Sequence, residues 1–157
     1  MSRRHRATKR TIQPDIVYNS ETLSKFINKL MLNGKKSLAR KIIYEALDRF
    51  AKKVNSDDPL AAFEQALENA MPTLEVKSRR IGGATYQVPI EIPANRRSSM
   101  AMKWIILNAR QKVGRNMTEG LAMELADCYT NQGATIKKKD DTHRMAEANK
   151  AFAHYKW

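Results

Sequence analysis

The 157-residue sequence has one cysteine, Cys128, and only three histidines. A single cysteine excludes a disulfide within the chain and is typical of a protein from a reducing compartment. No histidine stands at a metal-ligand spacing from that cysteine, so a zinc site is not predicted. The sequence lacks any run of 18 apolar residues, which argues against a transmembrane helix. No apolar stretch follows the basic N-terminus, which argues against a secretory signal.

Catalytic patterns are missing as well. His143 and His154 are eleven residues apart, roughly 16 Å along a helix, so they cannot share a metal ion. The sequence shows no Ser-His-Asp set, no glycine-rich dinucleotide loop and no cluster of metal ligands. Asn116-Met117-Thr118 matches a glycosylation sequon, but nothing else indicates secretion. We therefore predict that the protein is not an enzyme and needs no cofactor or metal.

Positive charge is abundant and unevenly distributed. The net charge is +13, of which residues 1–10 carry +5 and residues 71–115 carry +7, while the rest of the chain is nearly balanced. A surface that only needs solubility intersperses the two signs. Concentrated like charge repels itself, and a polyanion is the usual partner that relieves this repulsion. One such cluster is commonly just solvated, but two that hold nearly all the charge favour a nucleic-acid partner.

Apolar side chains recur at three- and four-residue steps in six segments, which predicts a mainly α single domain of about six helices. Capping residues, prolines and glycines set the expected ends of these helices. The expected helices run from Asn19 or Ser20 to Asn33, from about Leu38 to Val54, from Pro59 to Pro72, from Ser98 or Ser99 past Leu107, from Asn116 to Asn131, and from residues 140–142 to Tyr155. Residues 1–14 lack apolar periodicity and are predicted to form a flexible basic N-terminal arm, so the folded domain is expected over residues 15–157.

A β-hairpin is predicted at residues 73–92, inserted between the third and fourth helices. Apolar and polar residues alternate on both sides of Gly82-Gly83, and glycines suit the positive φ angles of a tight hairpin turn. Pro89 cannot donate to a β-ladder, so its strand should be an edge strand. A two-stranded arm is marginal alone in water, so it should lean on the helices or become ordered on a partner.

The hairpin carries the most informative charges. Lys77, Arg79 and Arg80 precede the turn, and Arg96 and Arg97 follow the second strand. Alternation along a strand directs Lys77 and Arg79 to one face and Arg80 to the other, which suits insertion between RNA segments. Arginine also makes bidentate phosphate contacts and stacks on bases. Charged edge strands can simply prevent aggregation, but that purpose needs one or two lysines rather than five bases.

Two other basic runs are ambiguous. Asn33-Gly34-Lys35-Lys36-Ser37 resembles the end of a phosphate-binding loop, but the first glycine of that motif and the preceding strand are absent, which excludes a nucleotide site. Either Lys35 and Lys36 hold an RNA phosphate at a helix N-terminus, or the turn is merely solvated. The run at residues 137–139 is followed by two aspartates, so RNA contact and solvation are equally plausible.

Several other residues have ordinary interpretations. Cys128 and Trp104 fall on apolar helix faces and are predicted to be core residues. His143, beside charged neighbours, is expected to be a hydrogen-bonding surface residue. Met145, Phe152 and Tyr155 are expected in the core or at a protein interface rather than around a cofactor.

Two long stretches resemble one protein family. Residues 72–92 (PTLEVKSRRIGGATYQVPIEI) and residues 142–157 (THRMAEANKAFAHYKW) resemble the hallmark segment and the C-terminus of the family of the seventh small-subunit ribosomal protein, in its bacterial and organellar form. The turn at residues 33–37 resembles the same family. The resemblance covers essentially the whole chain, with the motifs in the family's order. The basic N-terminus and the residues near Ala94 and Asn95 are least typical of the family.

This resemblance implies a six-helix domain with a protruding hairpin and a primary binder of small-subunit rRNA. It implies a role in organising the 3′ major domain, which becomes the head, with the hairpin near exit-site tRNA and the mRNA path. The eleventh and ninth proteins of the same subunit are implied as neighbours. Some bacterial members also repress translation of their own operon mRNA. The implied location is the ribosome, either in a bacterial cytoplasm or in an organelle.

Charge and resemblance together give three sets of predicted site residues. For contact with rRNA these are Arg3, Arg4, Arg6, Arg10, Lys35, Lys36, Lys77, Arg79, Arg80, Arg96, Arg97, Arg110 and Arg115. Near tRNA and mRNA they are Arg79, Arg80, Gly82, Gly83 and Thr85. Aromatic residues are enriched at protein interfaces, and a charge-balanced C-terminus provides Phe152, Tyr155 and Trp157 for one.

Two alternatives remain. A DNA-architectural protein with a β-ribbon arm would wedge apolar residues into the minor groove, whereas this turn is Gly82-Gly83 with cationic flanks. An enzyme acting on RNA would need an acid/base or metal set, and none is visible. We therefore expect no DNA or membrane partner.

Overall fold

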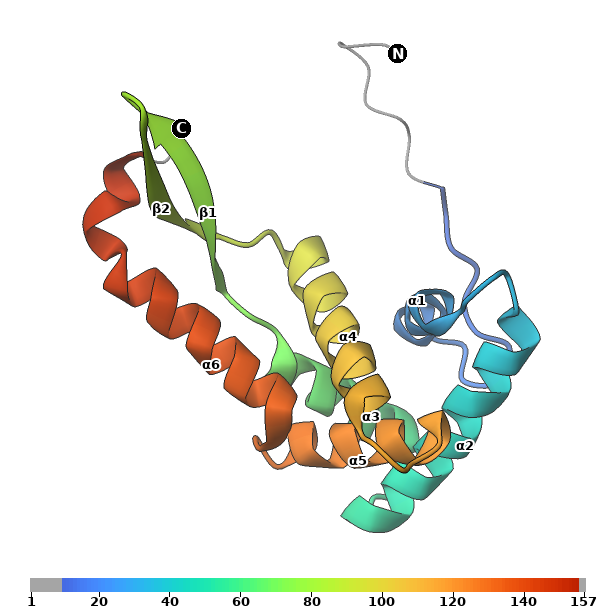
Figure 1. Cartoon of the computed structure of the whole chain (residues 1–157). Coiled ribbons are helices and arrows are strands. Elements are labelled where there is room, and N and C mark those ends of the chain that lie inside the picture. The colour runs from blue at the N-terminus through green and yellow to red at the C-terminus, as the bar shows by residue number, and fades with distance from the viewer. Residues whose placement is uncertain (1–9, 156–157) are drawn as a thin grey trace.

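The computed structural model describes residues 10–155. Within them the chain is mainly helical with one two-stranded antiparallel sheet, as the sequence predicts (Figure 1). In chain order the elements are α1 (Glu21–Leu30), α2 (Lys36–Val54), α3 (Pro59–Ala70), β1 (Leu74–Ile81), β2 (Ala84–Glu91), α4 (Ala94–Gln111), α5 (Met117–Tyr129), α6 (Gly133–Ala148) and the 3-10 helix η1 (Lys150–Tyr155).

Three helices begin where local capping signals predict. The hydroxyl of Ser20 accepts a hydrogen bond from the Leu23 amide at 3.3 Å. The carboxylate of Asp58 accepts from two amides of the first turn of α3, ahead of a helix that starts with proline. The side chain of Asn116 accepts from the Glu119 amide at 2.8 Å. Each cap satisfies amides that lack a partner at a helix N-terminus, typically stabilising the helix by about 1 kcal/mol.

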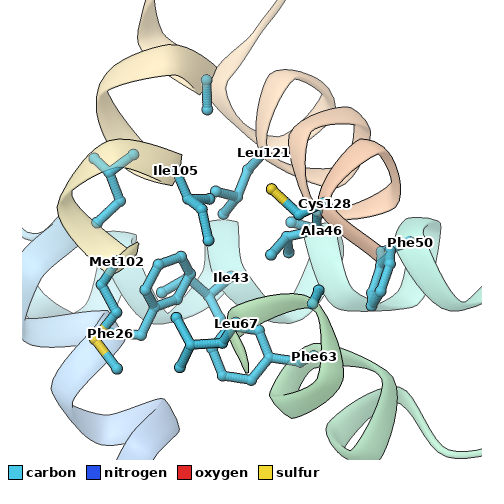
Figure 2. Packing of buried hydrophobic residues seen from close by; sticks show 14 of the residues in the cluster. Phe26, Ile43, Ala46, Phe50, Phe63, Leu67, Met102, Ile105, Leu121 and Cys128 are labelled. Atoms are coloured by element: carbon cyan, nitrogen blue, oxygen red, sulfur yellow. The ribbon is translucent and has the colours of Figure 1, made fainter. Parts of the chain in front are cut away.

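The core lies among the first five helices. Phe26 of α1, Ile43 of α2, Phe63 of α3 and Ile105 of α4 are all fully buried and converge in Figure 2. Cys128 of α5 joins them, which confirms it as a core residue, and Trp104 is only 8% exposed. Burying a large apolar side chain contributes roughly 1.5–3 kcal/mol, so this cluster fixes the arrangement of α1 to α5.

The hairpin and α6 extend away from this core. In Figure 1, α6 begins beside the end of α5 and leads to η1, which lies along the hairpin. Both α6 and η1 pack against the strands. The hairpin therefore leans on helices of its own chain, one of the two outcomes that its marginal stability requires.

Two predicted helix starts are wrong. Helix α4 begins at Ala94 with Pro93 as its cap residue, rather than at Ser98 or Ser99. Helix α6 begins at Gly133, immediately after the turn that ends α5, rather than at residues 140–142. Neither helix has a side-chain hydrogen bond from its own cap residue, so the local signal used for prediction is absent.

One apolar residue of the α2 periodicity is not buried. Leu38 lies in the first turn of α2 and is 53% exposed. Its side chain lines a surface groove together with Leu30 and Met117 instead of being covered. Spacing alone identifies a face of the helix, whereas burial also depends on which neighbours cover it.

Candidate nucleic-acid interface

The arm of the candidate interface is a regular hairpin. Residues pair from Leu74 with Glu91 through to Ile81 with Ala84, and the turn residues Gly82 and Gly83 have φ angles of 55° and 90°. Both values are positive, as a type I′ turn requires, which explains the two glycines. Thr85, just beyond the turn, is exposed. The tip therefore presents backbone and small side chains to solvent.

Cationic side chains follow the first strand outward. Lys77, Arg79 and Arg80 are all exposed, opposite Val88, Tyr86 and Thr85 respectively. Since successive side chains alternate between faces, Lys77 and Arg79 share one face and Arg80 occupies the other. Both faces of the arm thus carry positive charge.

At its base, the hairpin is joined to the first turn of α4. The Arg96 guanidinium donates to Glu75 Oε2 from Nη2 at 3.0 Å and from Nε at 3.3 Å, and Lys77 Nζ lies 3.2 Å from Glu75 Oε1. Arg97 Nε donates to the Ile92 carbonyl at 2.7 Å. The structure therefore brings Lys77 and Arg96 together at Glu75, holds Arg97 at the Ile92 carbonyl, and places both arginines inside a helix.

Glu75 is the residue that sequence reasoning missed. Its side chain is only 9% exposed. Burial opposes ionisation of the carboxyl, but hydrogen bonds and charge from Arg96 and Lys77 outweigh burial and lower the pKa of Glu75. The carboxylate therefore stays charged at neutral pH and holds two cations. The available signal was one acid within an otherwise basic strand.

A second cationic group lies at the last turn of α4 and the turn before α2. Lys35 and Arg110 border a groove of about 500 Å³ whose walls include Leu32 and Leu38. Arg110 Nη2 donates to the Leu30 carbonyl at 3.1 Å, which fixes its guanidinium at the rim.

Two backbone amides of the turn before α2 already have acceptors within the turn. The amides of Lys35 and Lys36 donate to the carbonyls of Leu32 and Gly34. Both lysine side chains are exposed, so they are what this turn offers to a phosphate. Arg115, at the end of the loop before α5, forms an ion pair with Glu119.

A third group surrounds Arg10. Arg10 and Lys25 line a groove of about 340 Å³ together with Asn95 and Ser98 of α4. This groove links the N-terminal segment to the helix that carries Arg96. Arg3, Arg4 and Arg6, which the sequence also assigns to RNA contact, lie outside the described residues.

The C-terminal aromatic residues pack onto the hairpin. The Tyr86 ring lies 5.3 Å from that of Phe152 and 5.4 Å from that of Tyr155, between centroids. Phe152 and Tyr155 remain partly exposed, while Trp157 falls outside the described residues. The same residues that we predict for a protein interface therefore also brace the arm.

Histidine and lysine side chains of α6 make further contacts. His143 Nε2 accepts a hydrogen bond from the Thr73 amide at 3.0 Å, which confirms His143 as a hydrogen-bonding surface residue. Lys139 Nζ donates to the Asn69 carbonyl at 2.7 Å, and Lys138 lies over the Trp104 ring. Two lysines of the 137–139 run are thus engaged within the chain.

Other kinds of site find little support in the part of the chain that the structure describes. No group of three or more His, Cys, Asp or Glu residues between positions 10 and 155 is arranged to hold a metal ion. None of the helices in that range combines the length and apolarity needed to cross a bilayer. The described structure instead offers grooves and an arm edged by lysine and arginine, which suit a polyanion.

Comparison with known proteins identifies the family. Residues 2–150 match the sequence model of the family described as ribosomal protein S7p/S5e. The chain is 71% identical to the small ribosomal subunit protein uS7 of Protochlamydia amoebophila over all 157 residues of both proteins. It is 66% identical to the proteins of the same name from Chlamydia felis and Chlamydia trachomatis, again over both full lengths. The chain therefore belongs to the ribosomal protein S7p/S5e family, a family of structural, rRNA-binding ribosomal proteins rather than enzymes.

Proposed function

We propose that the chain is a primary binder of small-subunit rRNA that organises the 3′ major domain during assembly of the head. The observation that carries this proposal is the junction at the base of the hairpin. There Lys77 and Arg96 converge on Glu75, and Arg97 donates to the carbonyl of Ile92, just after the second strand. A folded RNA offers closely spaced phosphates, and a preset group of cations matches such a target better than a dispersed charge does.

The proposed rRNA surface consists of three cationic groups on one chain. The hairpin base supplies specificity through orientation, while the other groups add phosphate contacts that position the protein. The members of the three groups are Lys77, Arg79, Arg80, Arg96 and Arg97 at the hairpin; Lys35, Lys36, Arg110 and Arg115 around the second groove; and Arg10 with the preceding Arg3, Arg4 and Arg6.

The hairpin tip has a separate proposed role. Projecting from the core, Arg79, Arg80, Gly82, Gly83 and Thr85 lie near exit-site tRNA and the mRNA path in this proposal. Small residues at the turn allow close approach of the backbone to a nucleic acid.

The C-terminus is proposed to meet neighbouring proteins of the subunit, the eleventh and the ninth. Phe152 and Tyr155 are partly exposed aromatic side chains, and such residues are enriched at interfaces. Truncation after Ala153 should weaken binding to the eleventh protein more than binding to rRNA. Because Tyr155 also contacts Tyr86, the melting temperature of the truncated chain is measured alongside. An equal loss of rRNA affinity would contradict the interface.

We further propose that the protein works on cytoplasmic ribosomes of a bacterium, an organellar ribosome being the alternative. Repression of its own operon mRNA is the regulatory part of the proposal. The operon leader mRNA should then compete with an rRNA fragment for the purified protein, and a leader that does not compete would exclude repression by this surface.

The test of the rRNA surface is a salt titration. Replacing Arg96 and Arg97 with glutamine removes two charges from the hairpin base. If both contact phosphates, the slope of log affinity against log salt should shrink by about 1.5 to 2 units, because each contact releases condensed counterion. A matched variant, Lys52→Gln with Lys53→Gln, removes two exposed charges from the end of α2 and should keep the original slope.

Footprinting on small-subunit rRNA completes the test. The protein should protect a site within the 3′ major domain and should prefer that RNA to duplex DNA at one salt concentration. Deleting residues 1–10 should lower affinity and flatten the salt dependence without moving the footprint. Equal binding to duplex DNA, or a wild-type slope in the Arg96 and Arg97 variant, would overturn the proposal.

A further inference from the structure

A buried carboxylate is an unexpected component of a surface that binds a polyanion. Glu75 lies near the start of β1, opposite Ile90, and its side chain is 9% exposed. Its two oxygens are divided between two elements, one facing Lys77 of the strand and the other facing Arg96 of α4. The negative charge therefore sits between two cations of the hairpin base.

The arrangement has a physical cost that calls for an explanation. Withdrawing a carboxylate from water is unfavourable unless it is paired and hydrogen-bonded. Here the pairing is complete, with the Nε and Nη2 atoms of Arg96 on Oε2 and Lys77 Nζ on Oε1. Both cations stay about half exposed, at 49% for Lys77 and 54% for Arg96. Each cation is therefore held in place on its inner side and open to a ligand on its outer side.

We propose that Glu75 is a positioning residue of the rRNA surface, fixing Lys77 and Arg96 so that the arm and α4 present one preset pair of cations. This inference rests on the proposed function. A free arginine or lysine side chain loses substantial rotamer freedom when it binds a phosphate. Side chains that are already held lose less, which raises affinity for an RNA whose phosphates match their spacing. Glu75 accordingly increases selectivity while it lowers the net positive charge.

If Glu75 acted only through its charge, Glu75→Gln would change RNA affinity in the opposite direction. Removing a negative charge from a cationic surface should strengthen binding to every polyanion. Under the positioning account, Glu75→Gln should weaken binding to the rRNA fragment on the order of tenfold, comparable to the loss of one well-placed arginine contact. Affinity for an unstructured RNA such as poly(U) should stay the same or rise, so the ratio of the two affinities should fall.

Glu91→Gln is the matched control. Glu91 is exposed, lies on the partner strand opposite Leu74, and forms no ion pair with any residue between positions 10 and 155. This variant removes the same charge from the same end of the hairpin. It should raise both affinities slightly and leave their ratio unchanged. If Glu75→Gln behaves like Glu91→Gln, the positioning role is excluded.

Arg96→Lys tests the same idea without changing the charge. Lysine cannot reproduce the two-nitrogen contact with Glu75 Oε2. The salt slope should stay within about 0.5 unit of wild type, since the number of charges is kept, while the affinity ratio falls. This variant decides the question if Glu75→Gln fails to fold. A wild-type ratio in Arg96→Lys would refute the positioning role, whereas a wild-type protein with no preference for the rRNA fragment would instead refute the proposed function.

Discussion

Replacing Lys112 with methionine should lower the free energy of unfolding by about 3–5 kcal/mol, the usual loss when one partner of a buried ion pair is removed. Lys112 follows the last turn of α4, and its Nζ lies 3.0 Å from both Glu124 Oε2 and Asp127 Oδ2. Glu124 is fully buried. Burial opposes the charge on Lys112, but its two carboxylate partners outweigh burial and raise the pKa of Lys112, so the lysine is charged at neutral pH.

The size of the effect follows from what Glu124 would lose. Its Oε1 accepts from the Thr135 amide at 3.1 Å and from the Thr135 hydroxyl at 2.6 Å. Among residues 10–155, its Oε2 has only the Lys112 ion pair, which is close but not aligned as a hydrogen bond. Without Lys112, a buried charge keeps hydrogen bonds on one oxygen and has no compensating cation. For a chain of this size, 3–5 kcal/mol corresponds to a fall in melting temperature of roughly 6–20 °C.

Urea denaturation and thermal melting measure this loss. Lys103→Met is the control, because Lys103 is an exposed lysine of α4, and a surface substitution changes stability by about 0.5 kcal/mol or less. The double variant with Glu124→Gln should recover part of the loss, because the neutral amide removes the uncompensated charge while its oxygen still accepts from Thr135. A Lys112→Met protein within about 1 kcal/mol of wild type would refute the reasoning.

Three further predictions concern the arm, acid stability and the buried thiol. Replacing residues 79–85 with a short glycine linker should leave the melting temperature nearly unchanged, because the segment adds almost nothing to the core. Assembled subunits should nevertheless show altered tRNA retention or frame maintenance. Failure of the variant to fold would contradict this prediction. Burial and the charge of a nearby lysine lower the pKa of His143 from its usual 6.5. On acidification the unfolded state therefore binds the proton first, so the contribution of His143 to stability should be full above pH 6.5 and fall below it. His143→Gln should flatten this pH dependence in denaturation curves between pH 7.5 and 5, and an equally steep dependence in the variant would rule out His143 as the cause. Burial raises the pKa of the Cys128 thiol to about 12, so a thiol reagent should label Cys128 only as the chain unfolds. Rapid labelling of the native protein would show that the buried face of α5 is accessible to solvent.

Much of the fold could be predicted from sequence because its signals are local. The hairpin follows from alternation on both sides of Gly82-Gly83, and the caps Ser20 and Asp58 lie within three residues of the amides they satisfy. The start of α6 could not be found in this way. The amide of Thr135 is satisfied by Glu124, eleven residues earlier in the preceding helix. When a helix is capped by a residue from another element, the residues around its start show no capping pattern.

The candidate site shows the same division. Residue type and charge clustering predict Lys77, Arg96 and Arg97 as contacts, since concentrated cations indicate a polyanion whatever their exact geometry, and this role stays a prediction. Their partners were not predictable. Glu75 and Arg96 are 21 residues apart, and Arg110 donates to a carbonyl 80 residues away. The sequence therefore shows which residues carry charge, whereas only the fold shows which charged side chains are held in place by a partner.

The arginines at the base of the hairpin have two roles that must be separated in any experiment. Arg96 and Arg97 connect the arm to α4 through Glu75 and the Ile92 carbonyl, and they are also proposed RNA ligands. A glutamine substitution removes the charge and the connection together, so a loss of RNA affinity by itself does not distinguish the roles. The salt slope counts phosphate contacts and is insensitive to a loosened arm. The ratio of affinities for structured and unstructured RNA depends on the orientation of the arm and changes little with total charge. Measured together on Arg96→Lys and on the double glutamine variant, these two quantities separate holding the arm from binding the RNA.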